Sequence, residues 1–462
     1  MTHDRSPIVA LATPAGRGAL AVVRLSGEGA FDVAARVTTP WPFVARRATV
    51  CTLRDATGAP IDRALAVAMP GPASFTGDDT VEFSVHGGSA VSAAVLAACI
   101  AAGAREARPG EYTRRAVLGG KLDLAQAEAI GDLVEATTQA MRRAALAQLD
   151  GGLSRRVAML RDALVSLDAL LAYDIDFPEE DDGPIAPARI ADAADRVLAA
   201  LNQLLATAPA GEAVRHGATV VIAGAPNAGK SSLFNALLGS ARALVTPVAG
   251  TTRDAIDAVL DTPRWPVRLV DTAGLRETAD VVERLGIEVS ERALAGASLV
   301  LACGESDHAL ADAVQRVRAL TEAPVLAVRT KGDVAEVGSR ADPSRTDDLR
   351  AETRVDGIVR VSAERGDGLP ALVTAMLEAL DARHGVQVDD APRLTRERHV
   401  RAVREARDEV ARFVSLWGDG ATPAVISATH VRGAIEALDG LIGTVSVDDV
   451  LDRVFATFCI GK

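Results

Sequence analysis

The sequence predicts a multidomain protein that combines α+β and α/β folds, and three observations support this expectation. The chain has 462 residues, too many for one ordinary hydrophobic core, so two to four domains are expected. Local patterns change from mixed strands and helices to helices alone, and then to alternating strands and helices. A glycine-rich string typical of phosphate loops lies in the alternating part. We therefore expect an N-terminal α+β domain and a central helical domain with an inserted α/β domain.

Residues 1–120 mix short β-like runs with loops rich in glycine and proline. The strand candidates are PIVALAT, LAVVRLS, RALAVAMP and TVEFSVHGG, and the single helical pattern is SAVSAAVLAACIAAG. Such a mixture predicts a compact α+β domain.

The rest of the chain reads as two helical segments around an α/β segment. Apolar residues recur at helical spacing in residues 121–216 and again in residues 379–462. In residues 217–378 the strand candidates ATVVIAG, PVRLVDTAG, ASLVLACG, APVLAVRT and GIVRVSA alternate with helical stretches. That alternation predicts a mostly parallel sheet. An insertion of this segment into the helical domain is expected, because domain termini often lie close together.

Composition excludes several classes of protein. The chain is 48% hydrophobic and 24% charged, as in globular proteins, and its net charge of −12 argues against a generic nucleic-acid coat. The four cysteines (Cys51, Cys99, Cys303 and Cys459) are too far apart for a typical zinc motif or small disulfide framework. No run is long and apolar enough to span a membrane, and no secretory signal begins the chain. We expect a cytoplasmic protein with no membrane partner.

A phosphate-binding loop is predicted in GAPNAGKSS, which follows the strand candidate ATVVIAG and opens a helical run. Backbone N–H groups of such a loop bind phosphate oxygens. Lys230 would reach the β- and γ-phosphates, and the Ser231 hydroxyl would be a Mg²⁺ ligand. The candidate contacts in the loop are Asn227, Ala228, Gly229, Lys230, Ser231 and Ser232.

Two later strings complete the phosphate and metal side of this site. Asp271 ends the apolar run VRLVD, where a carboxylate is expected near Mg²⁺, and the Gly274 amide would contact the γ-phosphate. Thr252 of PVAGTTRD is a candidate second Mg²⁺ ligand. The candidate residues in these strings are Thr246, Pro247, Val248, Ala249, Gly250, Thr251, Thr252, Asp271, Thr272, Ala273 and Gly274.

Two further strings predict guanine recognition, and hence a Ras-like P-loop GTPase domain. Asp333 of TKGD would accept two N–H bonds from the base, and the Lys331 stem would pack on the ring. Thr330 stands where asparagine is usual, so part of the amide's hydrogen bonding is lost. In SAERGDG the Ala363 amide would bind the guanine carbonyl. The candidate residues are Thr330, Lys331, Gly332, Asp333, Ser362, Ala363 and Glu364.

The stretch DTAGLRETADVVERLG lacks a catalytic side chain that Ras-type enzymes use. Those enzymes place a glutamine after the glycine to orient the attacking water. Here Leu275 follows Gly274, and a leucine side chain makes no hydrogen bond. Other groups must therefore support hydrolysis.

The order GAPNAGKSS, AGTTRD, DTAGLRETAD, TKGD and SAERGDG, closed by the tail FCIGK, resembles the MnmE (TrmE) family of tRNA uridine 5-carboxymethylaminomethyl modification GTPases. The strings IVALATPAGRGALAVVRLSG, SFTGDDTVEFSVHGG and RPGEYTRRAVLGGKLDLAQAEAI agree as well, so the resemblance covers essentially the whole chain. Val85 precedes HGG where the family has glycine, in an expected turn.

The resemblance implies a homodimer whose N-terminal domain binds 5-formyl- or 5,10-methylene-tetrahydrofolate and forms the dimer contact. With an FAD-dependent partner subunit, MnmG (GidA), the family adds an aminomethyl-type group to the wobble uridine of tRNA. The matching folate positions are Arg24, Glu82, Lys121 and Lys462. A carboxylate can grip a pterin edge, and basic side chains suit a glutamate tail. The alternative for Arg24 and Glu82 is a solvated strand charge.

The resemblance also supplies candidates for the missing catalytic group. Asn227, Thr246, Val248 and Thr251 match K⁺ ligands, so K⁺ would take the place of an arginine finger when two G domains meet. Glu283 matches the catalytic glutamate, and the Cys459 thiol would act near the transferred carbon. The alternatives are a surface charge near a helix start for Glu283 and a small buried hydrophobe for Cys459.

Two questions of partners and function stay open in the sequence. The arginine-rich run RLTRERHVRAVREAR at residues 393–407 is typical of a solvated helix face, and the alternative is a contact with tRNA or a partner subunit. The alternative function is a GTP-switched ribosome-assembly factor of the Era or Der type. The 216 residues before the G domain and the FCIGK tail argue against that alternative.

Overall fold

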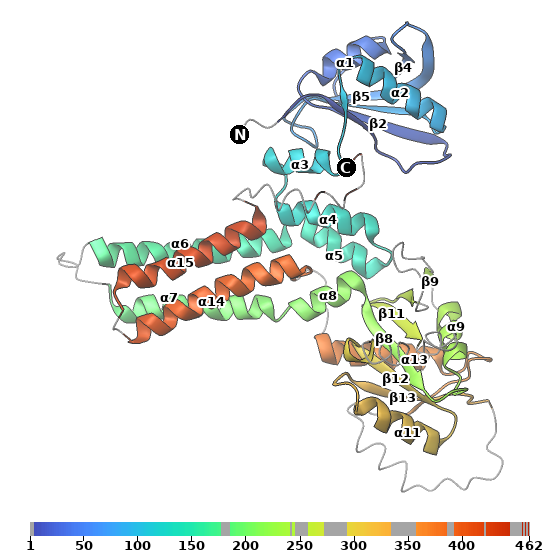
Figure 1. Cartoon of the computed structure of the whole chain (residues 1–462), viewed down its shortest axis with the longest axis vertical. Helices are drawn as coiled ribbons and strands as arrows, with labels where there is room; N and C mark the ends of the chain where they lie inside the picture. The colour runs from blue at the N-terminus through green and yellow to red at the C-terminus, as the bar shows by residue number, and fades with distance from the viewer. Residues whose placement is uncertain are drawn as a thin grey trace, which may run out of the picture. The chain divides into compact units, whose positions relative to one another are not determined.

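The computed structural model describes residues 4–176, 185–240, 243–244, 257–271, 293–333, 357–385, 392–419 and 422–443, and positions 455, 458 and 461. The chain forms two compact units, Met1–Gly131 with Leu438–Lys462 and Asp132–Ala437, and their elements are labelled in Figure 1. Across the described ranges, every helix is too short or too polar to cross a membrane. The boundaries expected after residues 120, 216 and 378 remain predictions.

The first unit contains a seven-stranded sheet in the order β3-β4-β5-β6-β2-β1-β7. Neighbouring strands are antiparallel, except that β7 runs parallel to β1. The strands are β1 Ile8–Leu11, β2 Leu20–Ser26, β3 Thr38–Thr39, β4 Thr49–Arg54, β5 Pro60–Met69, β6 Thr80–His86 and β7 Arg105–Glu106. The unit's helices are α1 Ala30–Val37, α2 Ser89–Ala101 and α3 Glu111–Leu118, and helix α4 Leu124–Glu135 continues into the second unit.

The two faces of this sheet differ, because side chains alternate along each strand. Val23 and Phe83 belong to the core that the sheet shares with α1 and α2. On the opposite face Leu20, Val50 and Leu65 are 64%, 58% and 48% exposed, and Val50 lies directly opposite Leu65 in the β4–β5 ladder. The sheet therefore has one covered face and one face with exposed apolar side chains.

The structure corrects the expectation for Val85. This residue is not in a turn, because it lies inside β6 opposite Ala21 of β2 and is 1% exposed. The turn begins at Gly87, where an added Cβ would overlap the Gly18 carbonyl oxygen. A strand residue buried against helices needs a side chain, so valine fits here better than glycine would.

The helical part of the second unit is built from amphipathic helices. Its helices are α5 Gln139–Leu149, α6 Gly152–Asp176, α7 Pro187–Leu205, α8 Ala208–His216 and α14 Glu397–Asp419, and helix α15 Ala424–Ile442 crosses the unit boundary. Buried residues of α14 recur three or four apart, at His399, Val403, Ala406, Val410 and Phe413, which is the pattern of a helix with one buried face. Glu409 of α14 bonds to His430 of α15, and Arg432 of α15 bonds to Asp168 of α6. Contacts between side chains thus join three of these helices.

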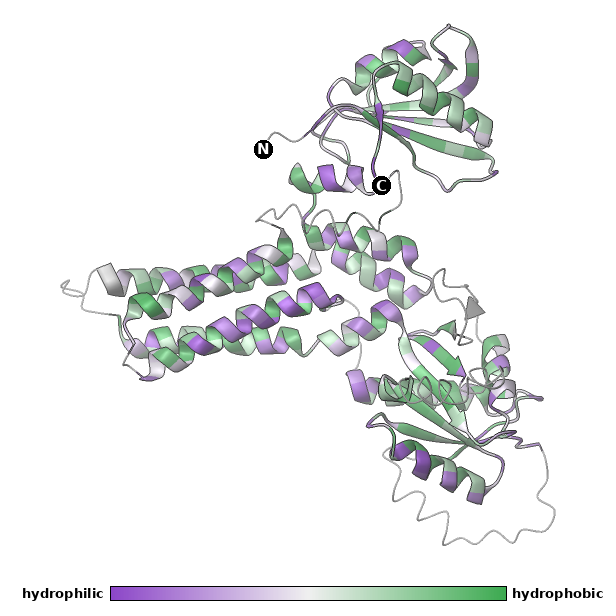
Figure 2. Ribbon diagram, viewed as in Figure 1, coloured by the Kyte–Doolittle hydropathy of each residue, from purple (hydrophilic) through white to green (hydrophobic). Residues whose placement is uncertain are grey.

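The other face of α14 carries the arginine-rich run, which appears hydrophilic in Figure 2. Within the run, Arg401 pairs with Glu405 and Arg407 with Asp408. Local pairs of this kind are expected of a solvated helix face. They support the solvated-face interpretation of the run.

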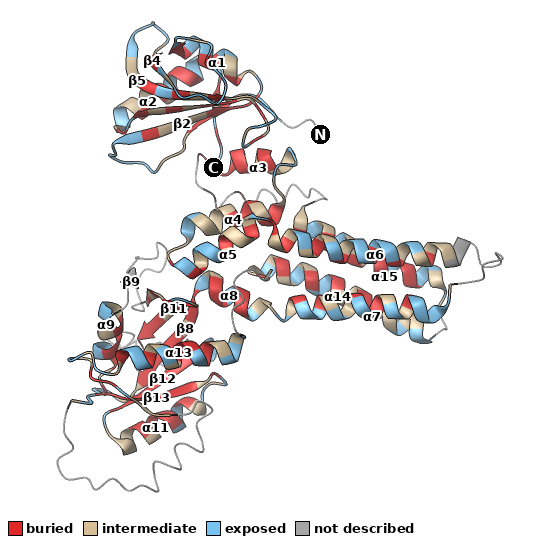
Figure 3. Ribbon diagram, turned by 180° about the vertical axis from the view of Figure 1, so that it is seen from behind, coloured by how far each residue is buried: buried red, intermediate tan, exposed pale blue. Residues whose placement is uncertain are grey.

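The remainder of the second unit is an α/β sheet in the order β14-β13-β12-β8-β11-β10-β9. The five neighbouring strands β14, β13, β12, β8 and β11 are parallel, as predicted. Strands β10 and β9 extend the sheet beyond β11 and are antiparallel to their neighbours. The strands are β8 Ala218–Gly224, β9 Ala243–Leu244, β10 Asp257–Asp261, β11 Pro266–Asp271, β12 Leu299–Gly304, β13 Val325–Arg329 and β14 Val359–Arg360, and the helices are α9 Lys230–Ser240, α11 Asp307–Arg318 and α13 Leu369–His384. The central strands are buried along their length (Figure 3), as helices on both faces require.

An ionic cluster lies where the chain passes between the helical part and this sheet. The Asp132 carboxylate accepts hydrogen bonds from Arg215, at the end of α8, and from Arg396, just before α14, at 2.9 and 2.7 Å. Gly211 packs so closely against Leu394 that an added Cβ would overlap its carbonyl oxygen. The segments that enter and leave the α/β sheet are thus held together, which is the geometry that an inserted domain needs.

Candidate functional site

The phosphate loop lies between the carboxyl end of β8 and the start of α9. Gly224 has a φ of +157°, and a Cβ at this position would overlap the carbonyl oxygen of Cys303 in β12, so only glycine fits there. Asn227 adopts a left-handed φ of 64°, a region that asparagine tolerates better than most residues. Lys230 is 8% exposed, and its ammonium donates to the Ala225 carbonyl at 2.8 Å. The loop therefore curls around its own lysine.

The structure brings the two predicted magnesium-binding groups together. The Ser231 hydroxyl donates to the Asp271 carboxylate at 2.8 Å. This contact follows from the parallel pairing of β11 with β8, which sets Asp271 beside Ile222 and hence near the start of α9. Mg²⁺ prefers hard oxygen ligands, so a hydroxyl and a carboxylate in contact fit the ion chemically.

Thr330 links the predicted base-binding loop to the phosphate loop. Its side chain is 4% exposed, and its hydroxyl lies 2.7 Å from the Ala228 carbonyl and 3.2 Å from the Gly304 carbonyl. A hydroxyl has one proton and can donate to one of them at a time. The shorter contact joins residue 330 to the loop that would hold the phosphates. Threonine at position 330 therefore keeps a hydrogen bond to the phosphate loop, although it lacks part of the hydrogen bonding of the usual asparagine.

The strings TKGD and SAERGDG, more than 25 residues apart in the sequence, lie side by side. The Gly332 amide donates to the Val361 carbonyl at 3.0 Å. The Ser362 hydroxyl donates to Asp333 and lowers the pKa of that carboxyl, which stays an ionised acceptor. Lys331 pairs with Glu305, while Ala363 is half-buried and Glu364 is exposed. Asp333 and the Ala363 amide therefore belong to one surface.

Several predicted residues lie outside the described residues, and their roles remain predictions. Among the predicted K⁺ ligands, the structure describes Asn227, which is exposed. The predicted residues outside the described ranges are Thr246, Pro247, Val248, Ala249, Gly250, Thr251, Thr252, Thr272, Ala273, Gly274, Glu283, Cys459 and Lys462.

In the first unit, the predicted folate residues Arg24 and Glu82 form a cross-strand ion pair. They are register partners in the β2–β6 ladder, and Arg24 Nε donates to Glu82 Oε1 at 2.8 Å. Their side chains are 23% and 30% exposed. The guanidinium carbon lies 5.7 Å from the ring centre of Phe75 and 5.6 Å from that of Tyr112, within reach of cation–π attraction. Sequence reasoning missed both aromatic residues, although each lies in a string that resembles the family.

Tyr112 also fixes the backbone of this pair. Its hydroxyl donates to the Arg24 carbonyl at 2.7 Å. Burial raises the pKa of the Tyr112 hydroxyl, which therefore keeps its proton and remains a donor. The position of Arg24 is thus supported from α3 as well as from the sheet.

The C-terminal tail reaches the same pair. Arg24 Nη1 donates to the Gly461 carbonyl at 3.4 Å. Gly461 has a φ of +100°, and an added Cβ would overlap the Leu11 carbonyl oxygen. Phe455 and Phe458 pack in a cluster with Leu124 and Ala127. Gly461 of the FCIGK motif therefore lies against strands β1 and β2 of the N-terminal sheet.

Lys121, the remaining described folate candidate, lies apart from the ion pair. It is exposed and lines a cavity of about 840 Å³, whose wall includes neither Arg24 nor Glu82. The structure thus brings two of the predicted folate residues into contact and leaves the third at a neighbouring hollow.

A mostly parallel sheet with a phosphate loop, an adjacent Ser–Asp pair and a TKGD loop defines a P-loop GTP-binding protein. Residues 124–459 match the model of the MnmE helical domain, and residues 7–121 match that of the GTP-binding protein TrmE N-terminus. The tRNA modification GTPase MnmE of Azoarcus sp. (strain BH72) is 43% identical over 98% of both chains. The Aquifex aeolicus (strain VF5) protein of the same name is 38% identical over 99% of this chain and 100% of its own length. The chain belongs to the MnmE family.

Among solved structures, a complex of Era with MgGDPNP and a 16S ribosomal RNA fragment is 28% identical, with a TM-score of 0.27. That match covers 35% of this chain and 56% of the Era chain. Family membership confirms the resemblance seen in the sequence and the assignment of the protein as a GTPase that uses GTP and Mg²⁺.

Proposed function

We propose that this protein is the GTP-hydrolysing subunit of a complex that adds a carboxymethylaminomethyl-type group to C5 of the wobble uridine of tRNA. The one-carbon unit would come from 5-formyl- or 5,10-methylene-tetrahydrofolate. The observation that carries the proposal is similarity to tRNA modification GTPases over nearly the full chain, including the N-terminal unit. A ribosome-assembly factor of the Era or Der type would not need that unit or the FCIGK tail.

In GTP hydrolysis, the described residues bind and orient the nucleotide. Asp333 accepts from the guanine edge, and Thr330 ties that loop to the phosphate loop through Ala228. Lys230 exchanges the Ala225 carbonyl for phosphate oxygens when GTP enters. Ser231 and Asp271 would hold Mg²⁺, which neutralises charge on the phosphates. Water attack on the γ-phosphate then gives GDP and inorganic phosphate, and Glu283 would orient that water.

Asn227 is the described residue that could contribute to a K⁺ site. Its backbone is left-handed and its side chain is exposed, so its amide oxygen is accessible to a cation and to the G domain of a second copy. Thr246, Val248 and Thr251 would complete the oxygen shell. K⁺ would supply positive charge beside the phosphates, the role of an arginine finger in other GTPases. In this proposal, pairing of two G domains would activate hydrolysis by bringing the K⁺ site into place.

In the N-terminal unit, Arg24 and Glu82 would hold the pterin part of the folate. The Glu82 carboxylate can accept two N–H bonds from the edge of the ring, and the hydrogen bond from Arg24 orients it. Phe75 and Tyr112 offer apolar surface for a planar ring beside the guanidinium. Lys462 and Cys459 would approach from the tail, whose Gly461 carbonyl accepts from Arg24.

A homodimer is supported by the uncovered face of the N-terminal sheet. Leu20, Val50 and Leu65 expose apolar surface there, and exposed apolar patches mark interaction sites in many proteins. A second copy of the same face would cover them. The FAD-dependent partner subunit MnmG and tRNA complete the proposed complex, which would act in the cytoplasm.

Binding of 5-formyltetrahydrofolate to the purified full-length protein tests this proposal against the ribosome-assembly alternative. Isothermal titration should give saturable binding that is independent of GTP. Glu82→Gln should weaken it about tenfold or more, since a charged hydrogen bond to the pterin edge is lost. Arg63→Gln, an exposed change on the same sheet, serves as the matched control. Absence of folate binding would favour a GTP-switched binding module.

A further inference from the structure

The cavity of about 840 Å³ in the first unit carries an excess of positive charge. Six basic and three acidic side chains line it, although the whole chain has a net charge of −12. Its volume lies within the range of roughly 300–1,000 Å³ that is usual for small-molecule sites. The basic residues are Arg5, Arg105, Arg108, Arg114, Arg115 and Lys121, and the acidic ones are Asp4, Asp78 and Glu111.

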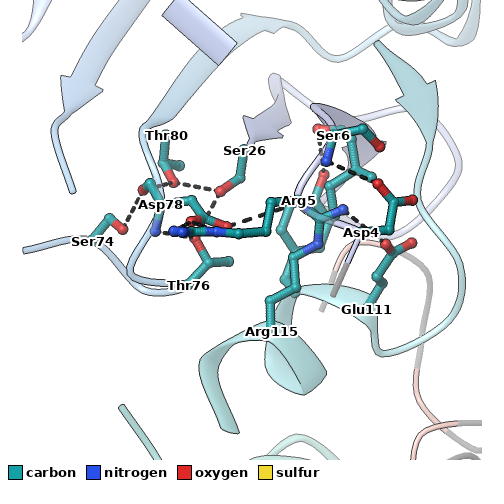
Figure 4. Close-up of polar contacts among 12 residues, drawn as sticks. Asp4, Arg5, Ser6, Ser26, Ser74, Thr76, Asp78, Thr80, Glu111 and Arg115 are labelled. Carbon is teal, nitrogen blue, oxygen red and sulfur yellow. Dashed lines mark hydrogen bonds and ion pairs between the residues drawn. The ribbon is translucent and has the colours of Figure 1, made fainter. Parts of the chain in front are cut away.

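The three carboxylates are already engaged by arginines of the same wall, as Figure 4 shows for several of them. Arg5 pairs with Asp78, and Arg105 bonds to Asp4 and Glu111 at 2.8 and 2.6 Å. Burial opposes ionisation of Glu111, but hydrogen bonds from Arg105 and from the Arg108 amide outweigh it and lower the pKa of that carboxyl. The three acids therefore hold Arg5, Arg105 and Arg115 in place, and the wall has six basic side chains against three acidic ones.

Arg115 is the most buried base in this wall, with 8% of its side chain exposed. One guanidinium nitrogen donates to Glu111 at 3.1 Å. Within the described ranges, its Nε and Nη1 have no hydrogen-bond acceptor, and Nη1 lies 4.0 Å from Asp78. A buried guanidinium with free donors is costly unless an acceptor is supplied. An anionic group in the cavity would supply it.

The cavity adjoins the proposed pterin site. Phe75, which contacts the Arg24 guanidinium, immediately precedes Thr76 in the cavity wall. Tyr112, the other aromatic contact of Arg24, immediately follows Glu111 of the wall. A folate held at Arg24 therefore has this cavity, with Lys121 in its wall, within reach of its far end. That end carries carboxylates.

We propose that this cavity binds the γ-linked glutamate tail of an oligoglutamyl folate, so that the protein prefers folates with several glutamates over the monoglutamate. The inference rests on the proposed folate binding and adds the form of folate that is used. Each γ-glutamyl residue contributes one α-carboxylate, and evenly spaced carboxylates match a wall of arginines. A cavity of this volume admits such a tail.

Isothermal titration of the full-length protein with 5-formyltetrahydrofolate as the mono- and the pentaglutamate tests the proposal. The pentaglutamate should bind about tenfold tighter, the gain of one charge-assisted hydrogen bond, and the gain should shrink as salt is raised. Arg108→Gln, at an exposed loop position, should weaken pentaglutamate binding more than monoglutamate binding and so reduce that gain. Arg47→Gln, an exposed arginine outside the cavity wall, should change neither.

The outcomes separate the two proposals. If the monoglutamate binds and the pentaglutamate binds no tighter, the tail site is wrong and the folate site stands. If neither binds, the proposed function itself fails. If Arg108→Gln weakens tRNA binding but leaves the pentaglutamate gain intact, the cavity serves RNA phosphates and the tail proposal is overturned. A second variant, Arg115→Gln, should lose the gain provided that circular dichroism shows it folded.

Discussion

The Thr330 hydroxyl lies 2.7 Å from the Ala228 carbonyl oxygen, so the loop that would read guanine is tied to the loop that would hold the phosphates. The two residues are 102 positions apart in the chain. Their contact fixes the spacing between base and phosphate subsites. It also gives a physical reason why threonine can stand at this position.

Thr330→Val should therefore weaken GTP binding. The change keeps the shape of the side chain but leaves the Ala228 carbonyl without this donor, which costs about 1–1.5 kcal/mol, or about fivefold to tenfold in affinity. Titration with a slowly hydrolysed GTP analogue measures the effect. Thr330→Asn should bind normally, because an amide also donates, and Thr374→Val on an exposed turn of α13 controls for the substitution. Unchanged affinity in Thr330→Val would show that the link is dispensable.

Asp333 should decide the choice of base. Asp333→Asn should lower GTP affinity about 10- to 100-fold, since two N–H groups of guanine lose a charged acceptor. The variant should gain affinity for xanthosine triphosphate, whose ring offers a carbonyl to the new amide. Asp367→Asn, on the neighbouring loop and exposed, should retain wild-type preference. Equal binding of ATP and GTP by the wild-type protein would contradict the role given to Asp333.

Much of the nucleotide site could be predicted from sequence because its parts are contiguous strings that follow strands. The order of β8, β11, β12 and β13 also follows from alternating strands and helices. The antiparallel strands β10 and β9 were not predicted, because DAVLD and the two-residue β9 carry little apolar pattern. In the structure β10 forms a hairpin with β11 across residues 262–265, and β9 pairs with the other edge of β10.

The N-terminal site was less accessible to sequence reasoning. Arg24 and Glu82 could be named from a family pattern, but their direct pairing follows from the register of β2 and β6. The roles of Phe75 and Tyr112 depend on loops and helices that meet only in three dimensions. The expectation for Val85 was wrong for a different reason: the residue precedes a turn, and the sequence does not show that the strand continues through it.

Docking of the C-terminal tail should depend on glycine at position 461. Gly461→Ala places a Cβ against the Leu11 carbonyl at a φ that disfavours side chains. The tail should detach, and 5-formyltetrahydrofolate binding should weaken about tenfold or more if the Arg24 contact is lost. GTP hydrolysis should stay at the wild-type rate. Gly440→Ala in α15, where an added Cβ meets open space, should be neutral for both, and full folate binding by Gly461→Ala would contradict this role of the tail.

Stability of the α/β sheet should fall at acidic pH through His384. Both ring nitrogens lack a hydrogen-bond partner among the described residues, and the ring lies 5.3 Å from that of Trp265. Burial, with a smaller effect of Arg383, lowers the pKa of His384 from 6.5 to about 4. The unfolded chain therefore takes up a proton near pH 6.5 that the folded protein resists. The stabilisation is present above pH 6.5 and is lost as the pH falls towards 4, by about 1–2 kcal/mol for a half-buried ring.

Trp265 fluorescence in a protein with Trp41→Phe and Trp417→Phe can follow this unfolding at pH 7.5 and pH 5. His384→Gln should remove most of the difference in stability between the two pH values. His308→Gln, an exposed histidine of α11, should leave the difference intact. If His384→Gln keeps the wild-type difference, other groups cause the acid sensitivity.

Reconstituted tRNA modification tests the central proposal most directly. The full-length protein would be incubated with the FAD-dependent partner subunit, unmodified tRNA, GTP, K⁺, 5,10-methylenetetrahydrofolate and a nitrogen donor (glycine or ammonium), and the nucleosides analysed by mass spectrometry. The account predicts a C5-aminomethyl-type uridine at the wobble position that disappears when GTP or the folate is omitted, and when Glu82→Gln replaces the wild-type protein. Modification that continues without folate, or that is unaffected by Glu82→Gln, would contradict it.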